Sequence, residues 1–298
     1  MPQLTLLNSM AGQEFGPSLD QQVAWGIQVL DLKDKILGKK VELLTDQEVA
    51  QAAKLISNRN LSVYCLSTNL FDADLEQGES VFVQDHLGQV DRVIQIAKVL
   101  NPTLIRFIAA TTSKRETITD SIEYLNRHHS WLIPLYGEGI RRIGDAGYCI
   151  TIENEARDCI FSRPEEILDF FEELNCGDSV NLTWDVQNLW QMGTYPSLEV
   201  YHELKSLLGY YHLKGGRQKS GSNELSWRSS LEDATWPVSE ITRQVIADQV
   251  SPVICLNGSH GKPKPDYDYD NIVKRDLEFL RSTFPKLRTD PSTTCLES

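Results

Sequence analysis

The chain has 298 residues, with 29 lysines and arginines against 42 aspartates and glutamates, which gives a formal net charge of −13. This acidic surplus argues against a nucleic acid as partner, because phosphate recognition needs basic side chains gathered on one face, and against attachment to an anionic membrane. A hydrophobic fraction of 41% with 24% charged residues is typical of a globular protein, and this composition suits a protein that handles small molecules or metal ions.

The cysteines indicate a reducing compartment. None of the six forms a C-x-x-C pair, and Cys65, Cys149 and Cys255 lie within apolar runs that are typical of strands. We therefore expect buried free thiols and a cytoplasmic location. We expect neither a signal peptide nor a membrane span, because the N-terminus has no basic flank and no run approaches about 18 apolar residues.

Short apolar runs alternate with amphipathic stretches along the whole chain. The apolar runs are nearly continuous in Val, Ile, Leu and Tyr, which predicts parallel strands buried on both faces. The stretches between them repeat apolar residues at helical spacing. In chain order the prediction is strand 4–7, helix 18–25, strand 27–32, helix 46–58, strand 61–66, helix 85–100, strand 104–109, helix 113–128, strand 148–153, helix 163–174, strand 180–185, helix 198–208, strand 210–214, helix 239–248, strand 253–257 and helix 270–281.

Eight strand–helix pairs favour one α/β fold, the (β/α)8 TIM barrel. Parallel neighbours need a crossover connection, and roughly 37 residues per pair is the size of a barrel unit. A doubly wound open sheet is the alternative, but residues 8–13 carry no glycine-rich phosphate turn. We expect a single domain over residues 1–298, with 284–298 as a flexible C-terminal tail. The long connections 69–80 and 215–237 follow the third and seventh strands, on the face where barrel active sites lie.

Three predicted strands carry side chains that suit a divalent metal ion. Glu153 ends the fifth strand, Asp185 ends the sixth and His212 lies in the seventh. Carboxylates with an imidazole are ligands of this kind of ion. A carboxylate after a strand is often a helix cap, and a single histidine is often a core residue. The occurrence of all three on consecutive strands favours a site.

These segments resemble the xylose-isomerase-like superfamily of TIM barrels, the sugar and sugar-phosphate isomerases and epimerases. The resemblance covers nearly the whole chain. In the segment 25–32, Asp31 stands where the family has a glutamate. The other matching motifs are Ile152-Glu153-Asn154, Asp185-Val186-Gln187-Asn188 and His212-Leu213-Lys214.

The resemblance implies a role for each matching residue. Glu153, Asp185 and His212 would be ligands of one divalent ion (Mn, Zn, Mg or Co), and Glu153 would also be the catalytic group that moves a proton. Asn257 ends the eighth strand where the family has a second glutamate, so it is the candidate fourth ligand, with His260 as the alternative. The implied substrate-binding residues are Asn188, Lys214, Arg217 and His260.

We therefore expect a metal-dependent isomerase or epimerase of carbohydrate metabolism that transfers a proton through an enediolate of a sugar, sugar phosphate or similar polyol. Asn257 departs from this mechanism, because an amide accepts no proton at neutral pH. Glu155, Lys214 or His260 would then be the second proton carrier. Lyase, dehydratase or hydrolase chemistry at the same metal site, and a ligand-binding barrel without catalysis, stay open as alternatives.

The expected partner is a small carbohydrate-like molecule. DNA-repair endonucleases share this barrel, but six histidines and a charge of −13 argue against that function, so neither nucleic acid nor membrane is expected as a partner. Loop cations could neutralise a substrate phosphate or be simply solvated. A homo-oligomer and a monomer are both compatible with the sequence. The loop cations in question are Arg217, Lys219, Lys262 and Lys264.

Overall fold

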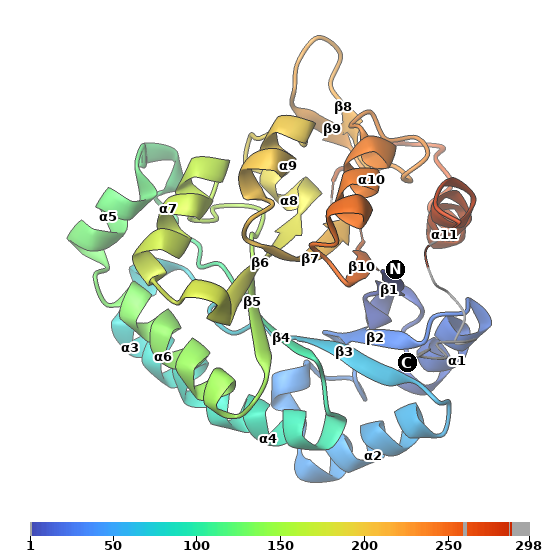
Figure 1. The fold of residues 1–298 in the computed structure, drawn as a ribbon, viewed down its shortest axis with the longest axis horizontal. Helices are drawn as coiled ribbons and strands as arrows, with labels where there is room; N and C mark the ends of the chain where they lie inside the picture. Colours follow the sequence, from blue (N-terminus) through green and yellow to red (C-terminus); the bar gives the residue numbers. More distant parts are fainter. Residues whose placement is uncertain (1, 259–260, 286, 288–298) are drawn as a thin grey trace, which may run out of the picture.

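The computed structural model describes residues 2–258, 261–285 and 287. Within them, eight parallel strands follow one another in the order β1-β10-β7-β6-β5-β4-β3-β2, and a single bridge between Leu7 and Asp31 brings the first and last strands together. The helices form a ring outside the strands (Figure 1). The predicted TIM barrel is confirmed, as a nearly closed barrel.

The barrel strands agree with the eight predicted ones to within two residues at each end. They are β1 (Gln3–Leu6), β2 (Val29–Leu32), β3 (Ser62–Ser67), β4 (Leu104–Ile108), β5 (Cys149–Glu153), β6 (Val180–Asp185), β7 (Leu208–Leu213) and β10 (Val253–Leu256). The helices are α1 (Phe15–Ala24), α2 (Asp46–Ser57), α3 (Glu79–Val81), α4 (Val90–Leu100), α5 (Ser121–His128), α6 (Leu132–Asp145), α7 (Pro164–Leu174), α8 (Val186–Gln191), α9 (Leu198–Leu204), α10 (Val238–Asp248) and α11 (Ile272–Thr283).

Local sequence signals explain several helix ends. Thr45 and Glu48 form a capping box at the start of α2, with each side chain bonded to the other's backbone. Pro164 opens α7, where its missing N–H costs nothing, and Asn175 ends that helix in a left-handed conformation. These helices begin within one residue of their predicted positions.

Three helices, the short α3 together with α6 and α8, and a hairpin were not predicted. Helix α6 lies between β4 and β5 and packs on α4, α7 and β5, which is the place of the crossover helix. The predicted helix 113–128 is shorter and occupies only Ser121–His128. Helix α8 directly follows β6. The connection 215–237 contains a short hairpin of β8 (Arg217–Gln218) and β9 (Leu225–Trp227), which projects from the barrel (Figure 1).

The core has two parts. The larger part lies between the sheet and the helix ring, where the outward-facing strand residues pack on the apolar faces of the helices. The smaller part contains Val29, Leu104, Tyr210 and Val253 from the strands and fills the barrel interior. Above it the inward-facing side chains are polar: the hydroxyls of Thr151 and Thr183, for example, lie 2.8 Å apart. The barrel therefore offers a buried polar interior at its carboxyl end.

The cysteine and tail predictions have mixed outcomes. Cys65, Cys159 and Cys255 are buried free thiols, but the prediction was wrong for Cys149, which begins β5 and is exposed. Of the expected tail, Phe284 and Leu287 are buried in the larger core, whereas 286 and 288–298 lie outside the described residues.

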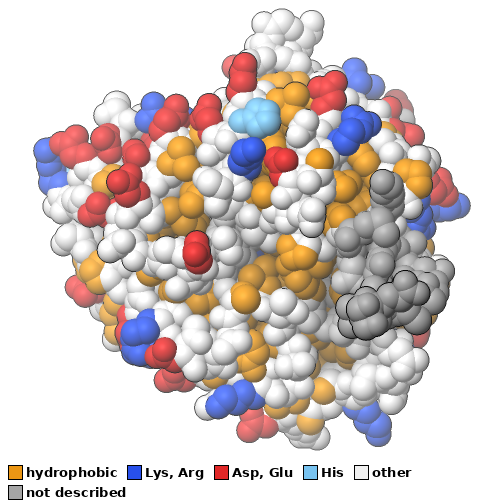
Figure 2. Space-filling view, in the orientation of Figure 1, with side chains coloured by type: hydrophobic (Ala, Val, Ile, Leu, Met, Phe, Trp, Pro, Cys, Tyr) orange, Lys and Arg blue, Asp and Glu red, His pale blue; other side chains and the backbone are white. Residues whose placement is uncertain are grey.

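The surface is charged, and the described helices are short. On the face shown in Figure 2, acidic and basic side chains alternate around the rim while the centre carries mostly uncharged ones. Within the described part of the chain, none of the helices has the length and apolarity needed to span a bilayer.

Candidate functional site

The carboxyl ends of β5, β6 and β7 bring Glu153, Asp185 and His212 together. Strand pairing places Asp185 opposite His212, and Glu153 lies on the neighbouring strand. One ligand atom from each of the three residues lies within 4.8 Å of the others, and all three side chains are buried. The sequence prediction that these residues form one group agrees with this geometry.

Asp185 has two separate tasks. Its Oδ1 accepts hydrogen bonds from the backbone N–H groups of Gln187 and Asn188 at 3.1 and 3.0 Å, so it caps α8. Its Oδ2 faces the interior, 2.7 Å from Nζ of Lys214 and 3.9 Å from Nδ1 of His212. Cap and site residue, weighed as alternatives from the sequence, are thus combined in one side chain.

Glu153 is held between a cation and the histidine. Its Oε2 is ion-paired with the guanidinium of Arg106, which is fully buried on β4. Its Oε1 lies 3.0 Å from Nδ1 of His212. Burial opposes ionisation of Glu153, but Arg106 and then His212 lower the pKa of this carboxyl far below its usual range. Glu153 is therefore ionised at neutral pH.

His212 is the counterpart of this carboxylate. Burial alone would lower the pKa of the imidazole, but the adjacent Glu153 raises it well above its ordinary value. Because Glu153 is ionised and can only accept, Nδ1 is the donor in this 3.0 Å contact. A metal ion that binds Nδ1 must displace this proton.

Asn257 completes the group from the end of β10. Its Nδ2 lies 3.0 Å from Oδ2 of Asp185 and 3.3 Å from Nδ1 of His212, and its buried Oδ1 has no hydrogen-bond partner within the described part of the chain. An exchange of the amide oxygen and nitrogen would turn this unpartnered oxygen toward the group. The donors present thus fit a divalent cation, with Glu153, Asp185 and His212 as strong ligands and Asn257 as a weaker one.

The predicted substrate-binding residues divide into two sets. Lys214 is buried, and its ammonium donates to Oδ1 of Asn188 at 2.8 Å as well as to Asp185, so both side chains adjoin the site. Arg217 lies in β8, where its guanidinium donates to the carbonyl of Asp233 and lies 5.9 Å from the ring of Trp227. His260 lies outside the described residues.

Glu155 lies beside the group rather than in it. Its Oε1 accepts hydrogen bonds from the backbone of Ala156 at 2.7 Å and from Nδ2 of Asn188 at 3.2 Å. Burial, and then the charge of Glu153, raise the pKa of this carboxyl. Its contact with Asn188 connects it to Lys214 through one side chain.

Sequence reasoning missed Arg106. The signal was a single arginine within the apolar run 104–109, because a buried arginine in a strand needs a carboxylate partner. Its guanidinium also donates to the carbonyl of Thr68 at 3.1 Å, which fixes it against β3. Arg106 and Lys214 together place one cation beside each of the two candidate carboxylate ligands.

A cavity of about 630 Å³ opens at the same end of the barrel. Its walls come from the segments that follow β5, β6, β7 and β10, and they combine polar and charged side chains with the apolar surfaces of Trp190 and Leu225; the candidate ligands are not among its described lining residues. The lining residues include Arg157, Trp190, Gln191, Asn223, Ser226 and Lys262.

Several solved structures share this fold. A xylose isomerase-like TIM barrel protein from Mycobacterium smegmatis, in complex with magnesium, has a TM-score of 0.70 at 14% identity, with 95% of this chain and 96% of that chain covered. A probable 3-DHS dehydratase of petrobactin synthesis from Bacillus anthracis has a TM-score of 0.69 at 12% identity, with 94% and 98% covered. D-psicose 3-epimerase in the presence of D-fructose has a TM-score of 0.68 at 13% identity, with 94% of this chain and 99% of that chain covered.

At these identities the likeness establishes the fold and not the activity. No curated protein sequence matches the chain significantly. The sequence profile described as xylose isomerase-like TIM barrel matches residues 23–283, which is most of the chain. The chain therefore belongs to the xylose isomerase-like TIM barrel family.

Proposed function

We propose that the protein is a divalent-metal-dependent enzyme that acts on a sugar, a sugar phosphate or a similar polyol, with proton transfer of the isomerase or epimerase type. The observation that carries this proposal is the buried group of Glu153, Asp185 and His212, whose ligand atoms lie within 4.8 Å of one another at the carboxyl end of the barrel. The magnesium complex and the D-psicose 3-epimerase among the similar structures support the same chemistry.

Each side chain has a part in this reaction. Glu153, Asp185 and His212 would hold a divalent cation, which would supply Lewis-acid polarisation of a substrate carbonyl and so acidify the C–H of the neighbouring hydroxyl-bearing carbon. Glu153 takes that proton as general base. Arg106 holds Oε2 of Glu153, so Oε1 is the oxygen that faces the reaction.

The polar neighbours would bind the substrate. The ammonium of Lys214, already positioned by Asn188 and Asp185, is placed to donate to a substrate oxygen. The amide and hydroxyl side chains in the wall of the 630 Å³ cavity, such as Gln191, Asn223 and Ser226, suit the hydroxyls of a polyol. Such a cavity can take the part of the substrate that does not react.

The experiment measures metal content and proton exchange together. Protein purified without chelator is compared with Glu153→Ala, His212→Ala and, as a control, Glu166→Gln, which alters a buried carboxylate on α7, outside the barrel mouth. We expect loss of bound metal in the first two variants only. Ketoses, aldoses and their phosphates are then incubated in deuterated water, and metal-dependent deuterium incorporation is expected. Equal metal content in all four proteins would refute the site.

A dehydratase or lyase is the second candidate, and Asn257 favours it. Inversion at carbon needs an acid opposite the base, and Asn257 cannot supply one. In an elimination on one face, the proton that Glu153 takes from carbon can be passed to the departing hydroxyl, which leaves as water, so one base and a carbonyl polarised by a bound cation would suffice. The probable dehydratase from Bacillus anthracis has the same fold. Release of a dehydrated product, in place of an epimer that carries deuterium, would identify this reaction.

A further inference from the structure

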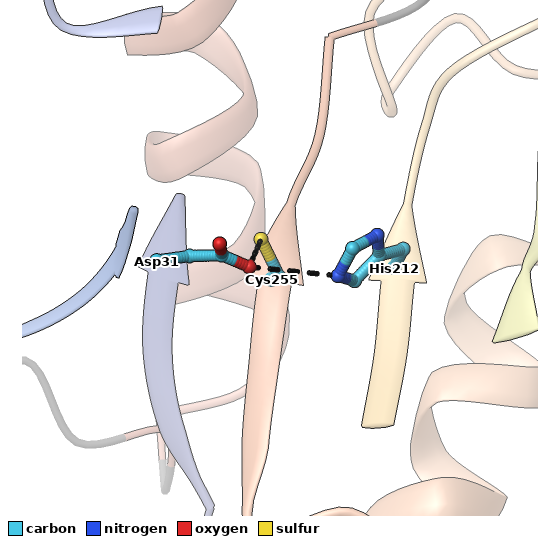
Figure 3. A group of neighbouring side chains, drawn as sticks. All are labelled: Asp31, His212 and Cys255. Atoms are coloured by element: carbon cyan, nitrogen blue, oxygen red, sulfur yellow. Dashed lines mark hydrogen bonds and ion pairs between the residues drawn. The ribbon is translucent and has the colours of Figure 1, made fainter. Parts of the chain in front are cut away.

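Asp31 is a buried carboxylate on the interior side of His212. It lies in β2, across the barrel from β7, and is fully buried. Its Oδ2 accepts a hydrogen bond from the hydroxyl of Tyr210 at 2.8 Å and lies 3.7 Å from Nε2 of His212. In Figure 3 the side chains of Asp31 and His212 point toward one another, with Cys255 of β10 between their strands.

The two nitrogens of His212 face different groups. Nδ1 faces the carboxylates of Glu153 at 3.0 Å and Asp185 at 3.9 Å. Nε2 is turned to Asp31, and among the described residues neither Nε2 nor Oδ1 of Asp31 has a hydrogen-bond partner within normal distance. A buried donor without a partner is costly. Oδ2 of Asp31 lies 3.7 Å from Nε2, so a small side-chain movement would bring the carboxylate within hydrogen-bond distance.

We propose that Asp31 is the positioning residue of His212, which accepts the Nε2 proton and thereby leaves Nδ1 as the nitrogen that binds the metal. The proposal rests on the function proposed above. A metal-bound histidine commonly donates its other N–H to a carboxylate, which fixes the tautomer and the ring orientation and strengthens the ligand. Tyr210 holds Asp31 in turn, and its ring lies edge-on to that of His212 at 4.6 Å.

A competing arrangement would use the same residues. Asp31, His212 and Cys255 also offer one ligand atom each within 4.8 Å and could hold a soft cation between them. The hydrogen bonds argue against it. Oδ2 of Asp31 is occupied by Tyr210, and Sγ of Cys255 lies 3.7 Å from Oδ2 of Asp31 and 3.5 Å from the carbonyl of Leu256, as expected of a protonated thiol.

Cobalt titration tests the proposal without any assay of activity. Metal-free protein is titrated with Co²⁺, and the dissociation constant is taken from the visible absorption bands. Asp31→Asn keeps the size of the side chain and removes its charge, so we expect binding to weaken about 10- to 100-fold. Tyr210→Phe should weaken it less. The Glu166→Gln control should bind as the wild type does, and thermal unfolding of each metal-free protein reports whether it folds.

The outcomes separate this proposal from the proposed function. If His212→Gln abolishes binding while Asp31→Asn and Tyr210→Phe both bind like the wild type, the role of Asp31 is refuted and the metal site stands. If His212→Gln also binds like the wild type, the metal site itself is refuted. A thiolate-to-cobalt charge-transfer band that disappears in Cys255→Ser would place the ion in the competing set and overturn the proposal.

Nitrogen NMR reads the tautomer directly. With Zn²⁺ bound, the labelled imidazole of His212 should show Nδ1 coordinated and Nε2 protonated. This assignment holds even if Asp31→Asn fails to fold, because it uses the wild-type protein. Coordination through Nε2 would contradict the proposal.

Discussion

The ammonium of Lys214 lies 2.7 Å from Oδ2 of Asp185, and both side chains are buried. This oxygen is the one that faces the other candidate ligands, because Oδ1 caps α8. Lys214 therefore competes with any cation for the same carboxylate oxygen. Arg106 has the corresponding place beside Glu153, so the chain neutralises both carboxylates with its own cations.

Replacement of Lys214 by Met should strengthen metal binding and weaken the metal-free fold. A divalent ion would no longer compete with the ammonium, so its affinity should rise by on the order of tenfold, or about 1.4 kcal/mol. Removal of one partner of a buried ion pair costs about 3–5 kcal/mol, so the metal-free protein should unfold more readily. Calorimetric titration with Mn²⁺ and urea unfolding measure the two effects.

The matched control for this variant is Lys219→Met. Lys219 is an exposed lysine on the hairpin loop, paired with Glu224 at 3.0 Å. Its replacement should change neither the Mn²⁺ affinity nor the stability of the metal-free protein, because exposed ion pairs contribute little to stability. An unchanged Mn²⁺ affinity in Lys214→Met would show that the ammonium does not compete for Asp185.

Replacement of Arg106 by Gln should produce a pH-dependent loss of stability. Arg106 is the strongest influence that lowers the pKa of Glu153, against the effect of burial. The pair thus contributes stability that is present above the ordinary glutamate pKa and is lost as pH falls through the lowered value. We expect a loss of about 3–5 kcal/mol at pH 7 that narrows as the pH falls below the ordinary glutamate value of 4.5, because a protonated Glu153 needs no counter-charge. Urea unfolding across this pH range measures it, and a loss independent of pH would contradict the explanation.

The sequence predicted the strands well and the connections less well. Buried parallel strands are nearly continuous apolar runs, so all eight were recognisable locally. Helix α6 has apolar residues at helical spacing (Leu132, Tyr136, Ile140 and Ile143), but Pro134 and three glycines in and beside that pattern obscured it. Its tertiary packing on α4 and α7 overrides these weak helix formers.

From the sequence, only the site residues at or near the ends of strands could be predicted. Glu153, Asp185 and His212 each end a strand or nearly do, and parallel neighbours bring such positions to one face. The partners inside the barrel depend on register and closure instead. Tyr210 reaches Asp31 across 179 positions of sequence, and Arg106 reaches Glu153 across 47. No local pattern encodes either contact.

Replacement of Asn257 by Glu should tighten metal binding. The side chain at this position faces Asp185 and His212, so a carboxylate there adds a charged oxygen to the candidate ligands. We expect Mn²⁺ affinity to rise by at least about tenfold, or 1.4 kcal/mol. Asn257→Gln is the control, because it has the length of Glu without the charge. Equal affinities of the two variants would show that residue 257 is not a ligand.

Asp276 on α11 makes the stability of the fold depend on pH independently of the candidate metal ligands. It lies on α11 with 5% of its surface exposed, and Oδ1 accepts the backbone N–H of Leu231 at 2.6 Å. Burial raises the pKa of this carboxyl from 3.8 to about 7, although Leu231 and Arg275 oppose the shift. The folded protein therefore keeps a proton that the unfolded chain has already released between these two values.

This difference in proton binding makes the free energy of unfolding fall as pH rises from about 4 to 7. The pH dependence should vanish in Asp276→Asn, which has no titratable group at this position. The wild type should lose on the order of 1–4 kcal/mol across the interval relative to the variant. Asn keeps a carbonyl oxygen for the N–H of Leu231, so the hydrogen bond is retained. Glu278→Gln, on the exposed side of the same helix, should leave the slope unchanged. Urea unfolding at several pH values measures the slopes, and parallel curves for wild type and Asp276→Asn would mean that Asp276 is ionised in the folded protein throughout.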